Sequence, residues 1–518
     1  MALPTALSKL LPADRIRDET SVRQLFAQDV YRRGELPLAV VSPRSTEEVS
    51  KVLAAATEAG CAVFVRGGGM SYTDAFLPDR EASIILDLSG LNAIRRIEAD
   101  DLYVTVEAGC TWEQLDEALV PHGVRPIFWG PMSGSLSTVG GAMSQGAATF
   151  GSGRNGVSAA AALGFEIVAA DGTVIKTGSD AQPHHTPFFR HYGPDLTGLF
   201  TGDAGALGVK TAVTLQLEPR PGHSSGLTFG FDTYRDLVAG VRRVARSGAA
   251  TEVFGAESAL ARKVADASTF KGDLKTLLSV GRAAGNPITG IGRMLSIAAN
   301  GRRFLDRSQY SVSFLTEGFS AAELRQNLKR IRAAAGSTGY EIANTMATVT
   351  RATPFPPPAV LGPGGLRLLP LNTIVPYSAA EGLHTEMNDL LEAHRQEFES
   401  LGIEVYLVYA TTGRSGFLYE LVIYWPDEWL ELHRETMPAA FLEHMQEQPP
   451  QPDVQQRVDE LKHSLVDVMY RHGGVHLQIG RCYPYTQERD AGALNLLRQL
   501  KNQLDPRGLI NPGALGLE

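Results

Sequence analysis

The chain has 518 residues, enough for two or three domains, and its 43% hydrophobic and 20% charged residues are typical of a globular protein. The net charge of −9 disfavours a nonspecific nucleic-acid binder and a basic membrane-binding surface. No apolar run reaches the length of a membrane span, no apolar leader segment follows Met1, and 3 scattered cysteines are too few for a disulfide framework, so we expect a cytoplasmic protein without a membrane anchor.

Short apolar runs predict most of the β-strands of the first part of the chain. One helix is signalled between the first two runs, because Ser45 and Glu48 have capping-box spacing and apolar residues repeat at helical spacing until Gly60. A turn at Asp171 and Gly172 predicts a hairpin. The predicted strands are residues 38–41, 62–65, 84–88, 102–107, 164–170, 173–176 and 208–217.

Capping signals and leucine spacing predict the other helices. Thr111 with Gln114 starts one, Ser320 with Glu323 a second, and a leucine stripe over 494–504 marks the last. We also expect a long helix from Ser378, with Glu381 at the box position, to Gly402, two aromatic-rich strands at 405–410 and 417–425, a stiff proline-rich loop at 353–365 and an exposed loop at 446–453.

Two glycine-rich segments, residues 66–72 and 130–156, suggest a long cofactor that carries phosphate. Glycine adopts positive φ without a Cβ penalty, so such loops can turn tightly and present bare N–H groups to an anion. The first segment directly follows a predicted strand. It matches neither the P-loop pattern nor the G-x-G-x-x-G dinucleotide fingerprint, which excludes the commonest nucleotide-binding motifs.

These segments, together with residues 193–208 and 505–513, resemble the flavoprotein family typified by vanillyl-alcohol oxidase and p-cresol methylhydroxylase. The motifs occur in the family's order along essentially the whole chain. The resemblance implies an α+β fold with a two-subdomain FAD-binding domain and a cap domain, which has an antiparallel sheet flanked by helices. By position, residues 1–221 and 471–518 would form the FAD-binding domain and residues 222–470 the cap.

The resemblance also implies which residues bind FAD. The first glycine loop would embrace the pyrophosphate, the second would line the pyrophosphate, the ribityl chain and the isoalloxazine, and two further segments would hold the adenine side and close the site. These residues are Arg66, Gly67, Gly68, Gly69, Met70, Ser71, Tyr72, Pro131, Ser133, Ser137, Thr138, Gly140, Gly141, Ser144, Gly146, Gly151, Gly153, Gly208, Val209 and Asn511.

Flavin chemistry on a carbon–hydrogen bond needs a proton acceptor and a group that balances negative charge. The dense segment 472–485 supplies both, and we interpret His476 as general base and Arg481 as anion stabiliser, with Gln478 on the face of His476. The alternative is a hydrogen-bonded core histidine and a structural ion pair. Tyr419 and Arg414 of the cap form a second pool of catalytic candidates, although sheet packing explains such tyrosines equally well, and Arg351 is a candidate carboxylate anchor.

Three departures from the family pattern narrow the expectation. Ser144 stands where phenol-oxidising members carry an aspartate, which puts their chemistry in doubt. Met70 and Leu366 stand where members with covalent flavin carry a histidine, so we expect dissociable FAD. The element 472–476 lacks the aspartate and asparagine of metal-dependent D-2-hydroxyacid dehydrogenases, so we expect no metal.

The predicted function is therefore FAD-dependent oxidation of a small alcohol, aromatic or otherwise. A D-2-hydroxyacid dehydrogenase is the alternative, and a non-redox lyase or synthase that uses FAD is a third class. The electron acceptor would be oxygen or an external partner. Neither nucleic acid nor a membrane is an expected partner, and a homodimer is an expectation by analogy with the family.

Overall fold

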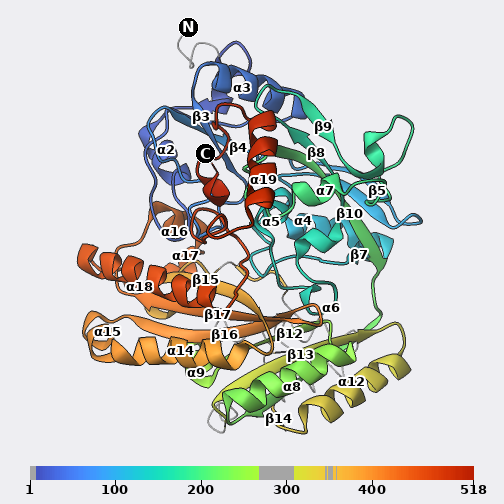
Figure 1. Ribbon diagram of the computed structural model, residues 1–518, viewed down its shortest axis with the longest axis vertical. Coiled ribbons are helices and arrows are strands. Elements are labelled where there is room, and N and C mark those ends of the chain that lie inside the picture. The colour runs from blue at the N-terminus through green and yellow to red at the C-terminus, as the bar shows by residue number, and fades with distance from the viewer. Residues whose placement is uncertain (1–6, 268–307, 345–346, 348–353, 358, 518) are drawn as a thin grey trace.

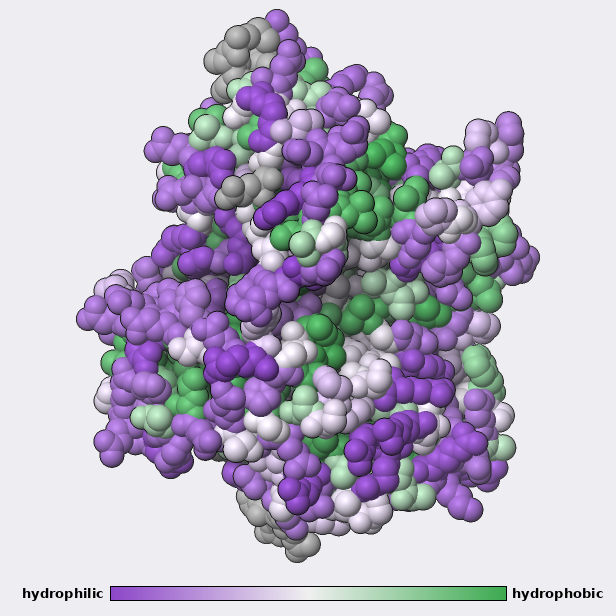
Figure 2. Space-filling model, viewed as in Figure 1, coloured by the Kyte–Doolittle hydropathy of each residue, from purple (hydrophilic) through white to green (hydrophobic). Residues whose placement is uncertain are grey.

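The computed structural model describes residues 7–267, 308–344, 347, 354–357 and 359–517. Three β-sheets organise these residues, two smaller sheets in the upper part of Figure 1 and a larger one in the lower part. The chain builds the upper part first, then the lower part, and returns to the upper part with its last residues. The face in Figure 2 is mostly hydrophilic, with hydrophobic residues in small groups.

The first sheet has the order β1 (Ile16–Arg17), β2 (Ala39–Val41), β4 (Ser83–Asp87) and β3 (Ala62–Arg66). Strands β2, β4 and β3 are parallel, and every residue of β2 and β4 is buried. Helix α2 (Thr20–Phe26) precedes β2, and helix α3 (Thr46–Glu58) connects β2 to β3. The Ser45 hydroxyl accepts from the Glu48 N–H at 3.1 Å, so the predicted start of α3 is confirmed.

The second sheet is antiparallel. Both bonds of the predicted capping box between Thr111 and Gln114 are present at the start of its helix α4. The sheet has the order β5 (Ile94–Glu98), β6 (Tyr103–Glu107), β10 (Val209–Pro219), β8 (Ala162–Val168) and β9 (Val174–Lys176), with β7 (Val124–Pro126) on β10. Its helices are α4 (Trp112–Leu119), α5 (Val139–Gln145), α7 (Leu196–Leu199) and α19 (Ala491–Leu504), whereas α6 (Ser152–Asn155) lies against the third sheet.

The third sheet is antiparallel throughout, and one of its faces carries a large aromatic core. Its order is β14 (Tyr340–Ile342), β11 (His223–Phe231), β13 (Tyr310–Gly318), β12 (Glu252–Glu257), β16 (Glu404–Thr412), β17 (Gly416–Trp425) and β15 (Arg367–Pro376). Buried residues of α8 (Tyr234–Ser247), α12 (Ala321–Ala335), α14 (Ala380–Ala393), α15 (Arg395–Leu401) and α18 (Pro452–Arg471) join this core. Because strand side chains alternate, the opposite face lies outside this core, and a smaller cluster around Leu260, Val422 and Tyr424 covers part of it.

The remaining elements are mostly short and lie in the segments between the strands and the longer helices. They are α9 (Ser258–Ala267), α16 (Glu431–Thr436), α17 (Ala439–Leu442) and the 3₁₀ turns η1 (Ala13–Arg15), η2 (Val120–His122), η3 (Ser158–Ala161), η4 (Gly178–Ala181), η6 (Pro363–Gly365) and η7 (Ala514–Gly516).

The C-terminal segment joins the upper and lower parts. Val475 forms an antiparallel bridge with Ile374 of the third sheet, and Ile510 forms a parallel bridge with Val63 of the first sheet. Between these bridges, the leucine stripe of α19 packs against the second sheet, as its spacing predicts. One stretch of fewer than fifty residues thus contacts all three sheets.

The predicted helix from Ser378 to Gly402 is wrong in two respects. Ala379 is the N-cap and no side chain caps the helix, so Ser378 and Glu381 form no capping box. His394, with φ −112°, separates α14 from α15. Gly402 ends α15 in the left-handed conformation that its position predicted. The sequence analysis also left β5, α8, α18 and the strands β11, β12, β13 and β15 of the third sheet unpredicted.

A buried ion pair joins the second sheet to the third. Arg125 of β7 donates to the carboxylate of Glu317 of β13 at 2.8 Å, and both side chains are almost fully buried. Arg125 also bonds Glu218 and stacks over Trp129. Removal of one partner from such a pair leaves an uncompensated buried charge, which destabilises more than the pair itself stabilises.

We therefore expect Arg125→Met to reduce the free energy of unfolding by about 3–5 kcal/mol, and Arg125→Met with Glu317→Met to recover much of that loss. Chemical denaturation followed by fluorescence measures both. The control is Arg235→Met, which removes an exposed pair with Glu381 and should change stability by no more than about 1 kcal/mol. Equal stability of the Arg125 variant and the wild type would contradict this role.

Candidate cofactor and substrate site

A cavity of about 700 Å³ lies between the glycine loops of the upper part and the face of the third sheet opposite the aromatic core. This volume is in the range of small-molecule and cofactor sites. Its wall is built from residues 67–72, residues 131–149, residues 204–210, and strands β11, β12, β13, β15, β16 and β17. Segments far apart in the sequence therefore meet at one site.

The first glycine loop leaves β3 at its carboxyl end. No backbone N–H group of residues 67–72 donates to another described group, so the loop offers a row of free donors to the cavity. Free N–H groups in a tight turn form an anion-binding concavity. Arg66 supports the loop from behind, because its guanidinium stacks over Phe26 at 4.5 Å and does not line the cavity. Burial lowers the pKa of Arg66.

The second glycine loop approaches the first backbone to backbone. A Cβ at Gly68 would overlap the carbonyl of Leu136, and a Cβ at Gly67 would overlap the hydroxyl of Thr138. That hydroxyl already accepts from the Gly141 N–H at 3.2 Å and starts α5. Glycine is therefore required where the two loops meet.

A third segment closes the cavity from the C-terminal end. The side-chain oxygen of Asn511 accepts from the Val65 N–H at 2.8 Å, and its amide donates to Ala204 at 3.2 Å. Lys210 lies on the same wall and pairs with Asp203 at 2.6 Å. The cofactor-site predictions that line the cavity are Gly67, Gly68, Gly69, Met70, Ser71, Tyr72, Pro131, Ser133, Ser137, Thr138, Gly140, Gly141, Ser144, Gly208 and Asn511.

Four further predicted cofactor residues lie behind the wall. Gly146 ends α5 with φ +70°, and Gly151 and Gly153 allow close backbone contacts with Ile127 and with β12. The side chain of Val209 belongs to the core beneath the first sheet. These residues shape the wall from behind. With Arg66, they are the predicted cofactor residues that do not line the cavity.

His476 and Arg481 make the contacts of the alternative interpretation, a hydrogen-bonded core histidine and a structural ion pair. The Nδ1 atom of His476 lies 2.9 Å from the Asn372 carbonyl, and its ring stacks on Tyr483 at 4.1 Å. Arg481 donates to the Asp74 carbonyl at 2.9 Å and pairs with Asp79. Neither lines the cavity.

Gln478 departs from the extended conformation that we assumed. Its φ of +52° breaks the two-residue alternation of the segment, so Gln478 does not share a face with His476. Leu477 and Gln478 line the cavity instead. The geometry thus keeps Gln478 at the site and removes its two predicted partners.

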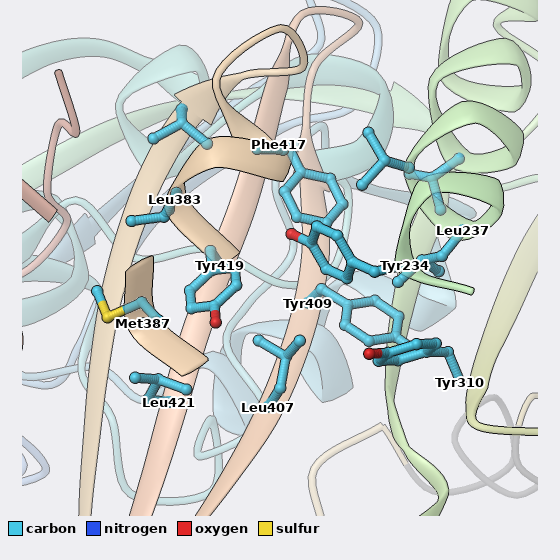
Figure 3. Packing of buried hydrophobic residues seen from close by; sticks show 14 of the residues in the cluster. Tyr234, Leu237, Tyr310, Leu383, Met387, Leu407, Tyr409, Phe417, Tyr419 and Leu421 are labelled. Carbon is cyan, nitrogen blue, oxygen red and sulfur yellow. The ribbon is translucent and has the colours of Figure 1, made fainter. Parts of the chain in front are cut away.

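The two cap candidates also lie away from the cavity. Tyr419 is buried in the aromatic core on the opposite face, among Tyr234, Tyr310 and Tyr409 (Figure 3). Its hydroxyl lies 3.2 Å from Nδ1 of His384, whose pKa burial lowers to about 4. Arg414 is exposed in the turn between β16 and β17. Neither of these two predicted catalytic residues lines the cavity. Arg351 lies outside the described residues.

Glu420 is the residue that sequence reasoning missed. It neighbours Tyr419 on β17 and so faces the cavity, opposite Asn372 of β15. Its carboxyl makes no hydrogen bond or ion pair with another described residue, and burial raises its pKa to about 7. A lone carboxylate in the middle of the otherwise apolar run 416–425 was the signal that could have revealed it.

Tyr72 and Gln478 complete a polar group beside Glu420. The amide of Gln478 donates to the Tyr72 hydroxyl at 2.8 Å. Burial, followed by the nearby Glu420 carboxylate, raises the pKa of Tyr72, which keeps the phenol protonated. Glu420, Asn372, Tyr72 and Gln478 together give the cavity one carboxylate, two amides and a phenol. We call these four residues the polar cluster.

The described residues contain neither a metal-binding group of side chains nor a candidate membrane-spanning helix. No group of three histidine, cysteine, aspartate or glutamate side chains is placed to hold a metal ion. No helix in the described ranges has both the length and the apolar character that a membrane span needs.

Comparison with known families assigns the cofactor. Residues 37–178 match the FAD-binding domain family, and residues 445–515 match the C-terminal domain of FAD-linked oxidases. The free N–H groups of the first loop fit a pyrophosphate, and the cavity has the size and the apolar wall that a flavin needs. The protein thus carries an FAD-binding domain, and the predicted cofactor, FAD, is confirmed.

Relatives in sequence match less than half of the chain. Mitochondrial D-lactate dehydrogenase [cytochrome] 1 of Saccharomyces cerevisiae is 31% identical over 214 residues, which is 41% of this chain and 35% of that protein. Matches to other curated relatives cover 51% or 42% of their length. The chain spans about a third to a half of the length of the curated relatives it matches.

Solved structures share the whole fold at low identity. p-Cresol methylhydroxylase with substrate bound has a TM-score of 0.73 at 17% identity, covering 100% of this chain and 96% of that one. Alkyldihydroxyacetonephosphate synthase has a TM-score of 0.68 at 15% identity, covering 98% and 84%. The predicted fold class, a two-subdomain FAD-binding domain with an antiparallel-sheet cap, is confirmed.

The contact between the glycine loops predicts the effect of one methyl group. Gly68→Ala should push the loops apart, because its Cβ would overlap the Leu136 carbonyl, and FAD affinity should fall at least about tenfold, the loss of roughly one hydrogen bond to a charged group. Flavin titration of deflavinated protein measures the affinity. The control is Gly222→Ala, where a Cβ meets no atom within 4 Å. Unchanged FAD affinity in Gly68→Ala would argue against the loop contact.

Proposed function

We propose that the protein is an FAD-dependent oxidoreductase that oxidises a small, uncharged alcohol with an apolar body. The observation that carries this proposal is Glu420, an unpaired carboxyl on a mostly apolar cavity wall. A buried group whose pKa lies near the working pH is suited to accept a proton. The FAD-binding domain and the p-cresol methylhydroxylase type of fold support the redox assignment.

The polar cluster supplies what an alcohol needs for oxidation. FAD, when bound, supplies the hydride acceptor. The deprotonated Glu420 carboxylate would accept the hydroxyl proton, and the amide of Asn372 and the phenol of Tyr72 would donate to the substrate oxygen and orient it. Gln478 would hold the Tyr72 hydroxyl in place through the bond at 2.8 Å.

The charge of the cavity favours a neutral substrate. Lys210 is the one cation among the described lining residues, and Asp203 already pairs with it. A substrate carboxylate beside Glu420 would therefore meet repulsion without a described counter-ion. A D-2-hydroxyacid is the second candidate because of the similarity to yeast D-lactate dehydrogenase, and it would need a cation from outside the described residues.

Anaerobic bleaching of the flavin separates the candidate functions. We expect primary and benzylic alcohols to bleach the flavin and D-lactate, glycolate and D-2-hydroxyglutarate to leave it oxidised. Bleaching by hydroxyacids alone would overturn the neutral-alcohol proposal. Consumption of a substrate with no bleaching by any donor would favour the non-redox class. Repeating the reaction in air then shows whether oxygen serves as acceptor.

Glu420→Gln should lower kcat/KM for the alcohol by roughly 10²–10⁴-fold, because it removes the proton acceptor and keeps the shape of the side chain. In the wild type, kcat/KM should fall as the pH drops below about 7, where Glu420 becomes protonated. The residual kcat/KM of Glu420→Gln should not show this fall at low pH. Glu257→Gln is the control, since Glu257 is also a buried glutamate with a raised pKa and does not line the cavity. An unchanged rate and profile in Glu420→Gln would refute the role.

The flavin should dissociate on denaturation. Among the described lining residues there is no histidine or cysteine to form a covalent bond, and Met70 lines the first loop. Acid precipitation should therefore leave a white pellet and a yellow supernatant, read by visible absorbance. A yellow pellet would show that the flavin is covalently bound.

A further inference from the structure

The cavity face of the third sheet has a polar group at each end and an apolar middle. Strand register places Ser311, Ala256, Val408, Glu420 and Asn372 in one row across β13, β12, β16, β17 and β15. All five line the cavity. The neighbouring row, Thr228, Ser313, Phe254, Ala410 and Leu418, is polar at the Thr228 end and apolar over the rest.

The hydroxyl groups at the far end have weak partners. Ser313 and Thr228 are 3.4 Å apart, Ser311 lies 3.4 Å from the Ala256 carbonyl, and Thr228 lies 3.3 Å from Asn344. Hydroxyl hydrogen bonds are strongest near 2.7–2.8 Å. Thr228 and Ser313 are nevertheless almost fully buried. Buried hydroxyls with long bonds retain capacity for a ligand atom.

Building on the proposed function, we propose that Thr228, Ser311 and Ser313 form a second subsite. The subsite binds a neutral hydrogen-bonding group, a hydroxyl or carbonyl, at the end of the substrate remote from the carbon that is oxidised. The hydroxyls can donate to that group or accept from it. No cation lies among these three residues, so a carboxylate bound there would have no counter-ion from them.

The sheet also sets the length of the substrate. Glu420 on β17 and Ser311 on β13 are three strand steps apart, which is about 14 Å at the usual strand spacing. The apolar strip between them, including Ala256 and Val408, fits an alkyl chain or an aromatic ring. The substrate class is therefore an elongated alcohol with a polar group at each end and an uncharged, apolar middle.

A length series with matched pairs tests this subsite. The probes are linear primary mono-alcohols and the matching terminal diols, from butyl to dodecyl. We expect diols of intermediate length to bind about tenfold more tightly than the matching mono-alcohols, one hydrogen bond's worth, and shorter diols to show no such preference. Dissociation constants come from perturbation of the flavin spectrum in the Glu420→Gln holoenzyme, and kcat/KM comes from anaerobic reduction of the wild type.

The double variant Ser311→Ala with Ser313→Ala should abolish the preference for diols and leave the affinity for mono-alcohols and the flavin content unchanged. The single variant Thr228→Val keeps the shape of the side chain and should weaken only the preference for diols. Ser225→Ala, on the same sheet and outside the cavity wall, is the control. Loss of flavin in the double variant would assign these hydroxyls to the cofactor and overturn the proposal. Absence of a diol preference at every length, or its persistence in the double variant, would overturn it as well.

The same measurements distinguish failure of the proposed oxidation from failure of the subsite. If diols bind with a length optimum that depends on Ser311 and Ser313 but reduce no flavin, the subsite stands and the oxidation proposal fails. If mono-alcohols reduce the flavin and diols gain nothing, the oxidation proposal stands and the subsite fails.

Discussion

The structure depends on one close approach, that of the two glycine loops. Where Gly67 and Gly68 meet Leu136 and Thr138, no side chain fits between the two backbones. The N–H groups of residues 67–72 have no described partners and line the cavity, so a bound ligand can satisfy them. The fold therefore contains an anion site built from main chain, which holds a phosphate-bearing cofactor without a dedicated lysine.

The third sheet serves two purposes because its faces alternate. On β17, Tyr419 enters the aromatic core that binds α8 and α14 (Figure 3). Its neighbour Glu420 lines the cavity. The core face makes the sheet rigid, and rigid elements hold reacting groups more precisely than loops do. One strand thus connects the stability of the cap to the position of the proposed proton acceptor.

Local signals in the sequence predicted much of the fold. Ser45, Thr111 and Ser320 all start helices as predicted. The side-chain oxygen of each accepts a hydrogen bond from the N–H three residues later, so the signal is local to one turn. Ser378 fails because the helix begins later, at Ala380. Helix α18 starts with Pro452 at its first position and Asp453 in its first turn, local signals that the loop predicted at 446–453 overlooked.

The site was harder to predict than the fold. The glycine loops carry their role in their own backbone, so most of the predicted cofactor residues line the cavity. Which polar side chains face the substrate depends instead on which face of β17 lines the cavity and on the positive φ of Gln478. A residue count could not reveal that His476 stacks on Tyr483 or that Glu420 stands alone. The sequence identifies polar residues that could act at the site, but tertiary contacts determine which of them line the cavity.

The affinity of the deflavinated protein for FAD, compared with its affinity for riboflavin, tests the central claim most directly. Riboflavin keeps the isoalloxazine ring and lacks the phosphates, so it cannot use the N–H groups of the first loop. The account predicts that FAD binds at least about a hundredfold more tightly, since several charge-assisted hydrogen bonds are lost with the phosphates. Equal affinity for the two flavins would contradict it.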